Sequence, residues 1–209
     1  MRHCLILLLT ICFCVGNCSA DEIFFDDFNS GPSVLWASEF GSWYESGGQY
    51  FASSPNNFPN AHSSLPFQLT DFTVEVDVTN ANDGGIWLRS EVAANGIGRT
   101  GVLLVTLGGI NYFHIVTGSG YGASINPYGV PGTSYNLRVE VSGNDYQTFI
   151  NGASSGFLST DIFSSGKTAV YSNSFPMGFD NFRIDAIPEP GSCLLVAGLF
   201  SLACIRRKR

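Results

Sequence analysis

The chain has 209 residues, of which 44% are hydrophobic and 13% are charged, and its formal net charge is −7. This length can form one domain with a substantial core, and it excludes two large domains once the apolar ends are set aside. All six cysteines lie in those ends: Cys4, Cys12, Cys14, Cys18, Cys193 and Cys204. Residues 21–187 therefore cannot form a disulfide scaffold, a cysteine nucleophile or a thiolate metal site.

Residues 21–187 are also strongly acidic. They contain 16 aspartates and glutamates against five cations, a net charge of −11. The cations are Arg89, Arg99, Arg138, Lys167 and Arg183. Because such a domain repels phosphate backbones, nucleic acid is not expected as a partner.

Residues 1–20 have the features of a secretory signal peptide. Arg2 and His3 precede an apolar run over 4–16, and small residues lead to a cleavage site after Ala20. The run is shorter than the roughly 20 residues that a membrane helix needs. We therefore expect export and cleavage by signal peptidase. Lipid attachment at Cys18 is the alternative, although Asn17 is a poor residue before such a cleavage.

The segment 188–209 has the order of a C-terminal membrane anchor. Pro188-Glu189-Pro190 is followed by an apolar run over 192–205 and four terminal cations. The prolines end preceding structure, the run can form a hydrophobic helix, and the cations resist translocation. This tail resembles the PEP-CTERM sorting signal, and the resemblance implies processing by an exosortase near the motif. The short span favours a transient inner-membrane anchor; a plain tail anchor is the alternative.

The region 21–187 shows period-two alternation and no sustained helical periodicity, which predicts a nearly all-β domain. In residues 72–79, valines and Phe72 share one face, and Glu75 and Asp77 share the other. An odd-length loop at 81–83 would join this strand to 85–89 in a hairpin. That register pairs Glu75 with Arg89 and Asp77 with Trp87, and it places all four side chains on the solvent face.

Further strands are predicted at 23–28, 101–107, 110–117, 135–141, 146–150 and 177–186. Turns are expected at Gly108-Gly109, at 143–145 and at Asn151-Gly152. The expected architecture is a twisted, two-sheet antiparallel sandwich in which the first and last strands lie side by side.

Several segments, in this order, resemble the concanavalin A-like jelly roll, especially its laminin G-like and glycan-binding or glycanase branches. They are residues 25–28, 83–89, 137–141, 149–152, 165–167 and 179–184. The resemblance covers most of the region 21–185. It implies a jelly-roll sandwich and a function connected with carbohydrate.

The glycanase branch directs attention to Glu75 and Asp77, because its members place Glu, Asp and Glu at alternate positions of one strand. Retaining hydrolysis needs two carboxyl groups about 5 to 5.5 Å apart. Here the third position is Thr79, so the set lacks its acid/base. The segment 85–89 also resembles a Gly-rich hairpin ending in arginine that is found in keto-sugar glycoside hydrolases, and this resemblance implies that Arg89 could orient a sugar or carboxylate. An exposed Glu75–Arg89 ion pair is the simpler interpretation.

Metal and nucleophile signals are weak. Laminin G-like relatives often bind calcium through loop carboxylates, and Asp83, Asp145 and Asp180 adjoin turns, so calcium is a candidate cofactor. Turn-forming aspartates are, however, commoner than ligands. His62 and His114 lack a metal-site spacing, and the sequence has no serine-nucleophile elbow or phosphate-binding loop.

Aromatic residues favour glycan recognition, since flat rings can stack on sugar faces. The candidate ligand-binding residues are Trp87, Arg89, Tyr112 and Tyr121, whereas Trp36 and Trp43 are assigned to the core. The leading hypothesis is an exported, non-catalytic module at the cell surface or in the extracellular matrix that binds glycan, such as an exopolysaccharide. The alternatives are a glycoside hydrolase and a structural or adhesive coat protein.

Overall fold

The computed structural model describes residues 20–55, 60–93, 98–118 and 120–187. The predicted signal peptide, apart from Ala20, and the predicted sorting tail with Pro188, Glu189 and Pro190 lie outside these residues. One compact unit spans Asp21–Ile187. Nowhere in the described ranges is there a helix of the length and hydropathy needed to cross a membrane.

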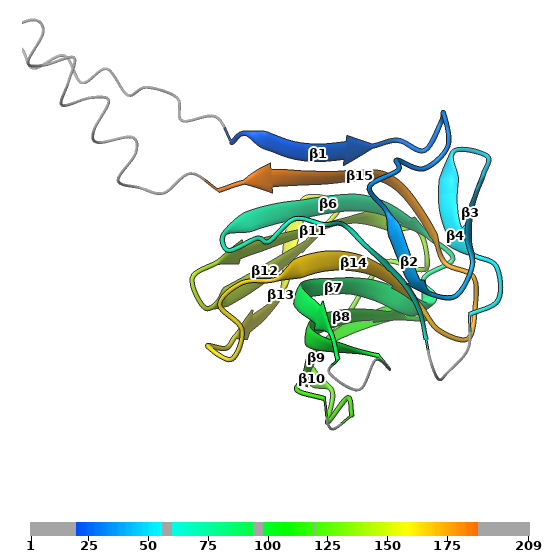
Figure 1. The fold of residues 1–209 in the computed structure, drawn as a ribbon. Helices are drawn as coiled ribbons and strands as arrows, with labels where there is room; N and C mark the ends of the chain where they lie inside the picture. The colour runs from blue at the N-terminus through cyan, green and yellow to red at the C-terminus, as the bar shows by residue number, and fades with distance from the viewer. Residues whose placement is uncertain (1–19, 56–59, 94–97, 119, 188–209) are drawn as a thin grey trace, which may run out of the picture. The chain divides into compact units, whose positions relative to one another are not determined.

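The strands of the described residues form two stacked antiparallel sheets (Figure 1). Sheet A has the order β13 (Ala153–Ser159), β12 (Asp145–Ile150), β11 (Tyr135–Ser142), β6 (Phe72–Thr79), β15 (Gly178–Ala186), β4 (Gln49–Ala52) and β3 (Trp43–Ser46), with β1 (Glu22–Asp26) also paired to β15. Sheet B has the order β10 (Ile125–Gly129), β9 (Ile110–Val116), β8 (Arg99–Leu107), β7 (Asn82–Val92), β14 (Lys167–Ser172), β5 (Ala61–Ser64) and β2 (Ala37–Phe40). The predicted all-β, two-sheet sandwich is confirmed.

The main core lies between the sheets and follows the predicted alternation. All four inward residues of β6 are buried: Phe72, Val74, Val76 and Val78. Ile86 and Leu88 of β7 face them across the sandwich and are completely buried. Trp36 lies in this core, where its indole N–H donates to Asp26 at 2.9 Å, and Trp43 packs against its edge. Each large side chain buried in this way stabilises the fold by about 1.5 to 3 kcal/mol.

Two predicted turns and one predicted strand pairing are confirmed. Leu107 pairs with Ile110 across the Gly108-Gly109 turn, and Ile150 pairs with Ala153 across Asn151-Gly152. Asn151 and Gly152 have φ angles of 49° and 79°, as a type I′ turn requires. The first and last strands, β1 and β15, also lie side by side (Figure 1).

The predicted hairpin between residues 72–79 and 85–89 is wrong. β6 lies between β11 and β15 in sheet A, whereas β7 lies between β8 and β14 in sheet B. The chain changes sheet at Asn80 and Ala81, where Asn80 has a φ of 52°. The alternation is the same for two strands that share a sheet and for two that face each other across a core, so it could not separate these arrangements.

Candidate functional site

Sheet B is covered on its outer face, the face turned away from the main core. A second hydrophobic cluster lies there, and Tyr112 and Tyr121 pack against it. The cluster consists of Trp87, Leu103, Val105, Val116, Ala169 and Tyr171. These residues alternate along β7, β8 and β14 with residues of the main core such as Ile86, Leu104 and Val170. The strands of sheet B therefore bury apolar side chains in both directions.

A pocket of about 340 Å³ opens on this outer face. It is lined by Asn60, Asp83, Leu103, Val105, Leu107, Tyr112, His114, Tyr121, Tyr171 and Asn173. Its volume falls within the range of small-molecule sites, about 300 to 1,000 Å³. Apolar surface from β8 is combined with phenol, amide, imidazole and carboxylate groups from β7, β9, β14 and the loops. This combination suits a ligand with both an apolar face and hydroxyl groups.

Asp83 contributes the carboxylate of the pocket. It lies at a register shift near the start of β7 with a φ of 149°, a conformation that non-glycine residues rarely adopt. Bulges of this kind redirect side chains beside functional sites. Asn173 donates to the carboxylate at 2.9 Å. Burial raises the pKa of Asp83, and hydrogen bonds from Ser174 and Asn173 oppose that rise.

Three tyrosines from separate parts of the chain meet in the pocket. The Tyr121 hydroxyl donates to the side-chain oxygen of Asn60, and the Asn60 amide donates to the Tyr171 hydroxyl at 3.3 Å. Burial raises the pKa of Tyr121 to about 12 and also raises the pKa values of Tyr112 and Tyr171. All three phenols are therefore protonated at neutral pH and can donate hydrogen bonds.

His114 lies on β9 between the tyrosines. Its ring centroid is 5.1 Å from that of Tyr112 and 5.7 Å from that of Tyr121. Burial lowers the pKa of His114, which favours the neutral imidazole at pH 7. Its Nδ1 is 3.1 Å from the carbonyl oxygen of Ala123, so the tautomer with a proton on Nδ1 donates there. That tautomer leaves Nε2 as an acceptor.

The structure brings together only part of the predicted ligand set. Tyr112 and Tyr121 line the pocket, as does Asp83. Trp87 is on the outer face of its strand, as predicted, but it is only 1% exposed because aromatic rings pack over it. Its ring centroid is 6.2 Å from those of both Tyr121 and Tyr171. The expectation that Trp87 is exposed is therefore wrong. The residue does not line the pocket but packs against two tyrosines that do.

Arg89 is buried and far from its predicted place opposite Glu75. Its φ of 45° lies at a register shift in β7, and the residue is 2% exposed. The guanidinium donates to backbone carbonyls from three loops: those of Thr70, Gly143 and Phe163. It also forms an ion pair of 3.3 Å with Asp71. Arg89 thus joins loops at one end of the sandwich and does not take part in the pocket.

The candidate catalytic carboxylates Glu75 and Asp77 belong to the other sheet. Both lie on the outer face of β6 in sheet A. Asn136 and Asn181 donate to the two carboxylate oxygens of Asp77 at 3.0 and 2.9 Å. The predicted grouping of Glu75 and Asp77 with Arg89 is therefore not present.

The three calcium candidates also lie apart. Asp83 is in sheet B, whereas Asp145 begins β12 and Asp180 lies on β15, both in sheet A. Within the ranges that the structure describes, histidine, cysteine, aspartate and glutamate form no group of three that could hold a metal ion. Calcium binding stays a prediction.

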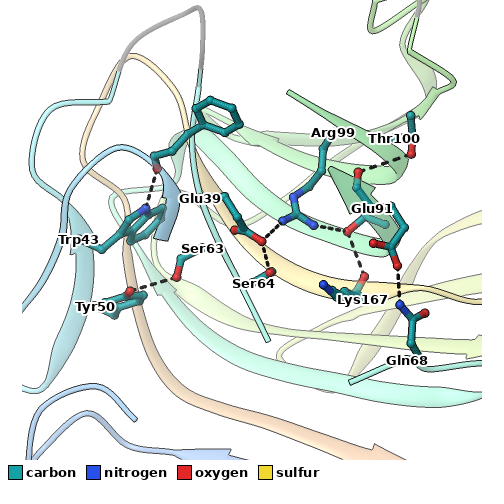
Figure 2. A network of polar contacts seen from close by, with 12 residues as sticks. Glu39, Trp43, Tyr50, Ser63, Ser64, Gln68, Glu91, Arg99, Thr100 and Lys167 are labelled. Atoms are coloured by element: carbon teal, nitrogen blue, oxygen red, sulfur yellow. Dashed lines mark hydrogen bonds and ion pairs between the residues drawn. The ribbon is translucent and has the colours of Figure 1, made fainter. Parts of the chain in front are cut away.

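A buried polar network, which the sequence did not suggest, continues along the outer face of sheet B (Figure 2). Arg99 of β8 forms an ion pair of 2.5 Å with Glu39 of β2 and donates to Ser90 of β7 at 3.1 Å. Ser64 of β5 donates to the same Glu39 oxygen. The network links four strands of one sheet through a single buried guanidinium.

Several polar atoms of this face have no hydrogen-bond partner within the described part of the chain. They are Glu39 Oε2, His62 Nε2, Trp87 Nε1 and Arg99 Nε. His62 packs edge-on against Phe40, with a centroid separation of 4.7 Å. Burial, with a smaller contribution from the Arg99 charge, lowers the pKa of His62 to about 3, so this imidazole is neutral.

No protein-family model matches the sequence, and no curated protein sequence is significantly similar to it. Solved structures do resemble the fold. A carbohydrate-binding module, CBM66 from Bacillus subtilis, superimposes with a TM-score of 0.61 and 18% identity over 73% of this chain and 96% of that one. The exoplasmic/lumenal domain of VIP36, bound to Ca²⁺ and Man3GlcNAc, gives a TM-score of 0.55 and 12% identity over 80% and 90% of the two chains.

A third similar structure is the GH43 protein BlXynB from Bacillus licheniformis, with a TM-score of 0.58 and 14% identity. That match covers 80% of this chain but 40% of the other. At such low identities the likeness concerns the fold alone. The comparisons place this chain among jelly-roll sandwiches of the kind found in carbohydrate-binding modules and lectins, which confirms the predicted fold class.

Proposed function

We propose that this protein binds glycan, without cleaving it, in the pocket on the outer face of sheet B. The observation that carries the proposal is the convergence of three tyrosines, two asparagines, His114 and Asp83 on an apolar surface of β8. A sugar ring offers an apolar face and a rim of hydroxyl groups, and these groups match both properties. The carbohydrate-binding proteins among the structural neighbours support the same class of ligand at the level of the fold.

The polar groups of the pocket are arranged for hydroxyl recognition. The phenols of Tyr112 and Tyr171 are protonated and can donate, whereas the Tyr121 hydroxyl gives its proton to Asn60 and can accept. The Asp83 carboxylate can accept, and the Nε2 of His114 accepts in the tautomer described above. Asn60 also donates to Asn173 at 3.0 Å, so the amides and phenols form one connected network. A connected network positions its members before ligand arrives, which reduces the entropy lost on binding.

The carboxylates favour binding over hydrolysis. Glycoside hydrolysis uses two carboxyl groups that flank one bond. Among the lining residues, all of which the structure describes, Asp83 supplies the single carboxylate. Glu75 and Asp77 are on the other sheet, and the amides of Asn136 and Asn181 occupy the Asp77 oxygens. We therefore favour a binding module over the hydrolase alternative.

A glycan array and polysaccharide pull-down test this function. The full chain is used in a detergent without a sugar headgroup, with and without calcium. Tyr121→Ala and Asp83→Asn should each reduce retention, while Asp145→Asn, an exposed change on sheet A, should not. Blank arrays and pull-downs in both calcium conditions would contradict glycan binding. Retention that is equal for all three variants would place the ligand elsewhere.

We further propose that the protein acts outside the cell, at the surface or in the extracellular matrix, after exosortase processing. This rests on the sequence features of residues 1–20 and 188–209. Mass spectrometry of protein from its native host, separated into membrane, wall and medium fractions, tests it. A product that starts at Asp21 and ends near Ile187 in the outer fractions is expected. An intact C-terminus held in the membrane would contradict sorting.

A further inference from the structure

The charge of the pocket is unbalanced. Asp83 is the only lining residue with a carboxylate, and the lining contains no lysine or arginine. The lining contains one histidine, His114, and burial lowers its pKa, so the imidazole carries little charge at pH 7. The pocket therefore presents one negative charge without a cation of its own.

The cations of the domain are engaged elsewhere. Four of them form ion pairs: Arg89 with Asp71, Arg99 with Glu39, Arg138 with Glu140, and Arg183 with Glu22 and Asp185. The fifth, Lys167, begins β14, four residues before Tyr171 of the pocket. At about 3.3 Å per residue this places the two backbones about 13 Å apart along the strand. No cation of residues 21–187 thus offsets Asp83 inside the pocket.

The surroundings of Asp83 favour a cation. Burial raises its pKa, which means that the carboxylate has lost part of its hydration. The pKa values of Tyr112, Tyr121 and Tyr171 are raised mainly by burial and in part by the charge of Asp83, so all three phenols are within electrostatic reach of that carboxylate. Aromatic rings beside a carboxylate attract organic cations through both the ring quadrupole and the charge.

We propose that the pocket selects an amino sugar, a glycan unit with a protonated amine, over neutral sugars and over uronic or sulfated sugars. This inference rests on the proposed glycan-binding function and specifies its ligand class. The ammonium group contacts the Asp83 carboxylate, and the sugar ring occupies the tyrosine-lined volume. Anionic glycans are disfavoured by Asp83 and by the net charge of −11 of residues 21–187.

The test compares oligosaccharides of identical length and linkage that differ in charge. The probes are a β1,4-linked glucosamine oligomer and its fully N-acetylated form, with oligogalacturonate as the anionic member. Isothermal titration calorimetry is performed on the full chain at low and high salt. We expect the amine form to bind about tenfold more tightly than the N-acetyl form at low salt. The preference should shrink in high salt, and when the pH rises above the amine pKa.

Two isosteric variants locate the charge. Asp83→Asn should bring the ratio of the two affinities close to one and retain binding of the N-acetyl oligomer, because asparagine still accepts from Asn173. Asp145→Asn removes an equal charge from an exposed site on β12 and should leave the ratio unchanged.

The outcomes separate this inference from the function on which it rests. Equal affinity for the amine and N-acetyl forms, or a preference for oligogalacturonate, overturns the charge preference and leaves glycan binding standing. If the ratio of amine to N-acetyl affinity falls equally in Asp83→Asn and Asp145→Asn, Asp83 is not the source of the charge preference. Blank titrations with all three probes, together with blank glycan arrays, remove glycan binding and the charge preference with it.

Discussion

Asp83 and Asn173 are joined by two hydrogen bonds. The backbone N–H of Asn173 donates to the backbone carbonyl of Asp83 at 2.9 Å, and its side-chain amide donates to the Asp83 carboxylate at 2.9 Å. The first bond connects the start of β7 to the residue after β14, and the second fixes the carboxylate at the edge of the pocket. The position of the only pocket carboxylate therefore depends on a residue 90 positions away in the sequence.

Asn173→Ala should weaken glycan binding while preserving the backbone bond. The change removes the hydrogen bond that holds the Asp83 carboxylate and also the bond that Asn173 accepts from Asn60 at 3.0 Å. We therefore expect at least a roughly tenfold loss of affinity, or about 1.4 kcal/mol. Calorimetry with the glycan identified on the array measures the affinity, and urea unfolding reports the accompanying change in stability. Unaltered affinity in a folded variant would mean that Asp83 does not need this support.

The buried pair Arg99–Glu39 makes a second prediction. Glu39→Gln leaves the guanidinium of Arg99, whose side chain has no exposure, without its counter-charge. We expect a loss of about 3 to 5 kcal/mol in the free energy of unfolding. The double variant Glu39→Gln/Arg99→Met should recover part of that loss, because both charges are then removed.

Glu140→Gln is the matched control. The Arg138–Glu140 pair has a similar separation, 2.6 Å, but both side chains are about one-third exposed. Its loss should cost at most about 1 kcal/mol. Equal costs for the two glutamate variants, measured by urea unfolding, would contradict the importance of burial.

His62 should make the fold sensitive to acid. Its pKa is lowered from 6.5 to about 3 in the folded protein, so below pH 6.5 the unfolded chain gains a proton that the folded one does not. Stability from this group is therefore complete above pH 6.5 and is lost as the pH falls toward 3, at about 1.4 kcal/mol per pH unit.

His62→Gln removes this titration. The variant should be less stable at pH 7 but should show a flatter dependence of unfolding free energy on pH between 6.5 and 3. His114→Gln serves for comparison, since His114 is less buried than His62. An unchanged slope in the His62 variant, measured by urea unfolding at several pH values, would exclude His62 as the cause.

Arg89 and Arg183 offer a matched pair of arginine-to-lysine changes. A lysine at 89 cannot reach the carbonyls of Thr70, Gly143 and Phe163 together, so we expect a loss of about 3 kcal/mol in stability. Lysine at 183, on an exposed side chain whose ion pairs are screened by water, should leave the stability nearly unchanged. Glycan affinity of the folded Arg89→Lys protein should be unchanged; a large loss would restore Arg89 as a ligand residue.

The sequence predicts sheet A better than sheet B, and burial explains the difference. β6 and β11 each have one buried and one partly exposed face, so their apolar residues alternate. Every residue of β5 is buried, as are the last five residues of β14, because the outer face of sheet B is also covered. Buried positions without alternation do not produce a period-two signal. The sequence also predicted no strand at β2, β3, β4, β10 or β13.

The site was predicted only in part, because several of its residues meet through strand pairing and not through a local sequence pattern. Tyr112 and Tyr121 were predicted because aromatic residues are common in glycan sites, whereas Asp83 was predicted as a candidate calcium ligand beside a turn and not as a glycan-binding residue. Asn60 and Tyr171 are 111 positions apart and meet because β5 pairs with β14. No local sequence pattern predicts such a contact, since the contact depends on the order of strands in the sheet.

The pairing of β1 with β15 has a mechanical consequence. The strands are antiparallel, Glu22 lies opposite Asp185, and the backbone N–H of Ala186 donates to the carbonyl of Asp21 at 2.8 Å. Both ends of the compact unit therefore leave at the same point of sheet A. A pulling force between them loads the hydrogen bonds of this pair one after another, as in a zipper, and not all at once as in shear. β1 should peel away at low force before the pocket on the other sheet is disturbed.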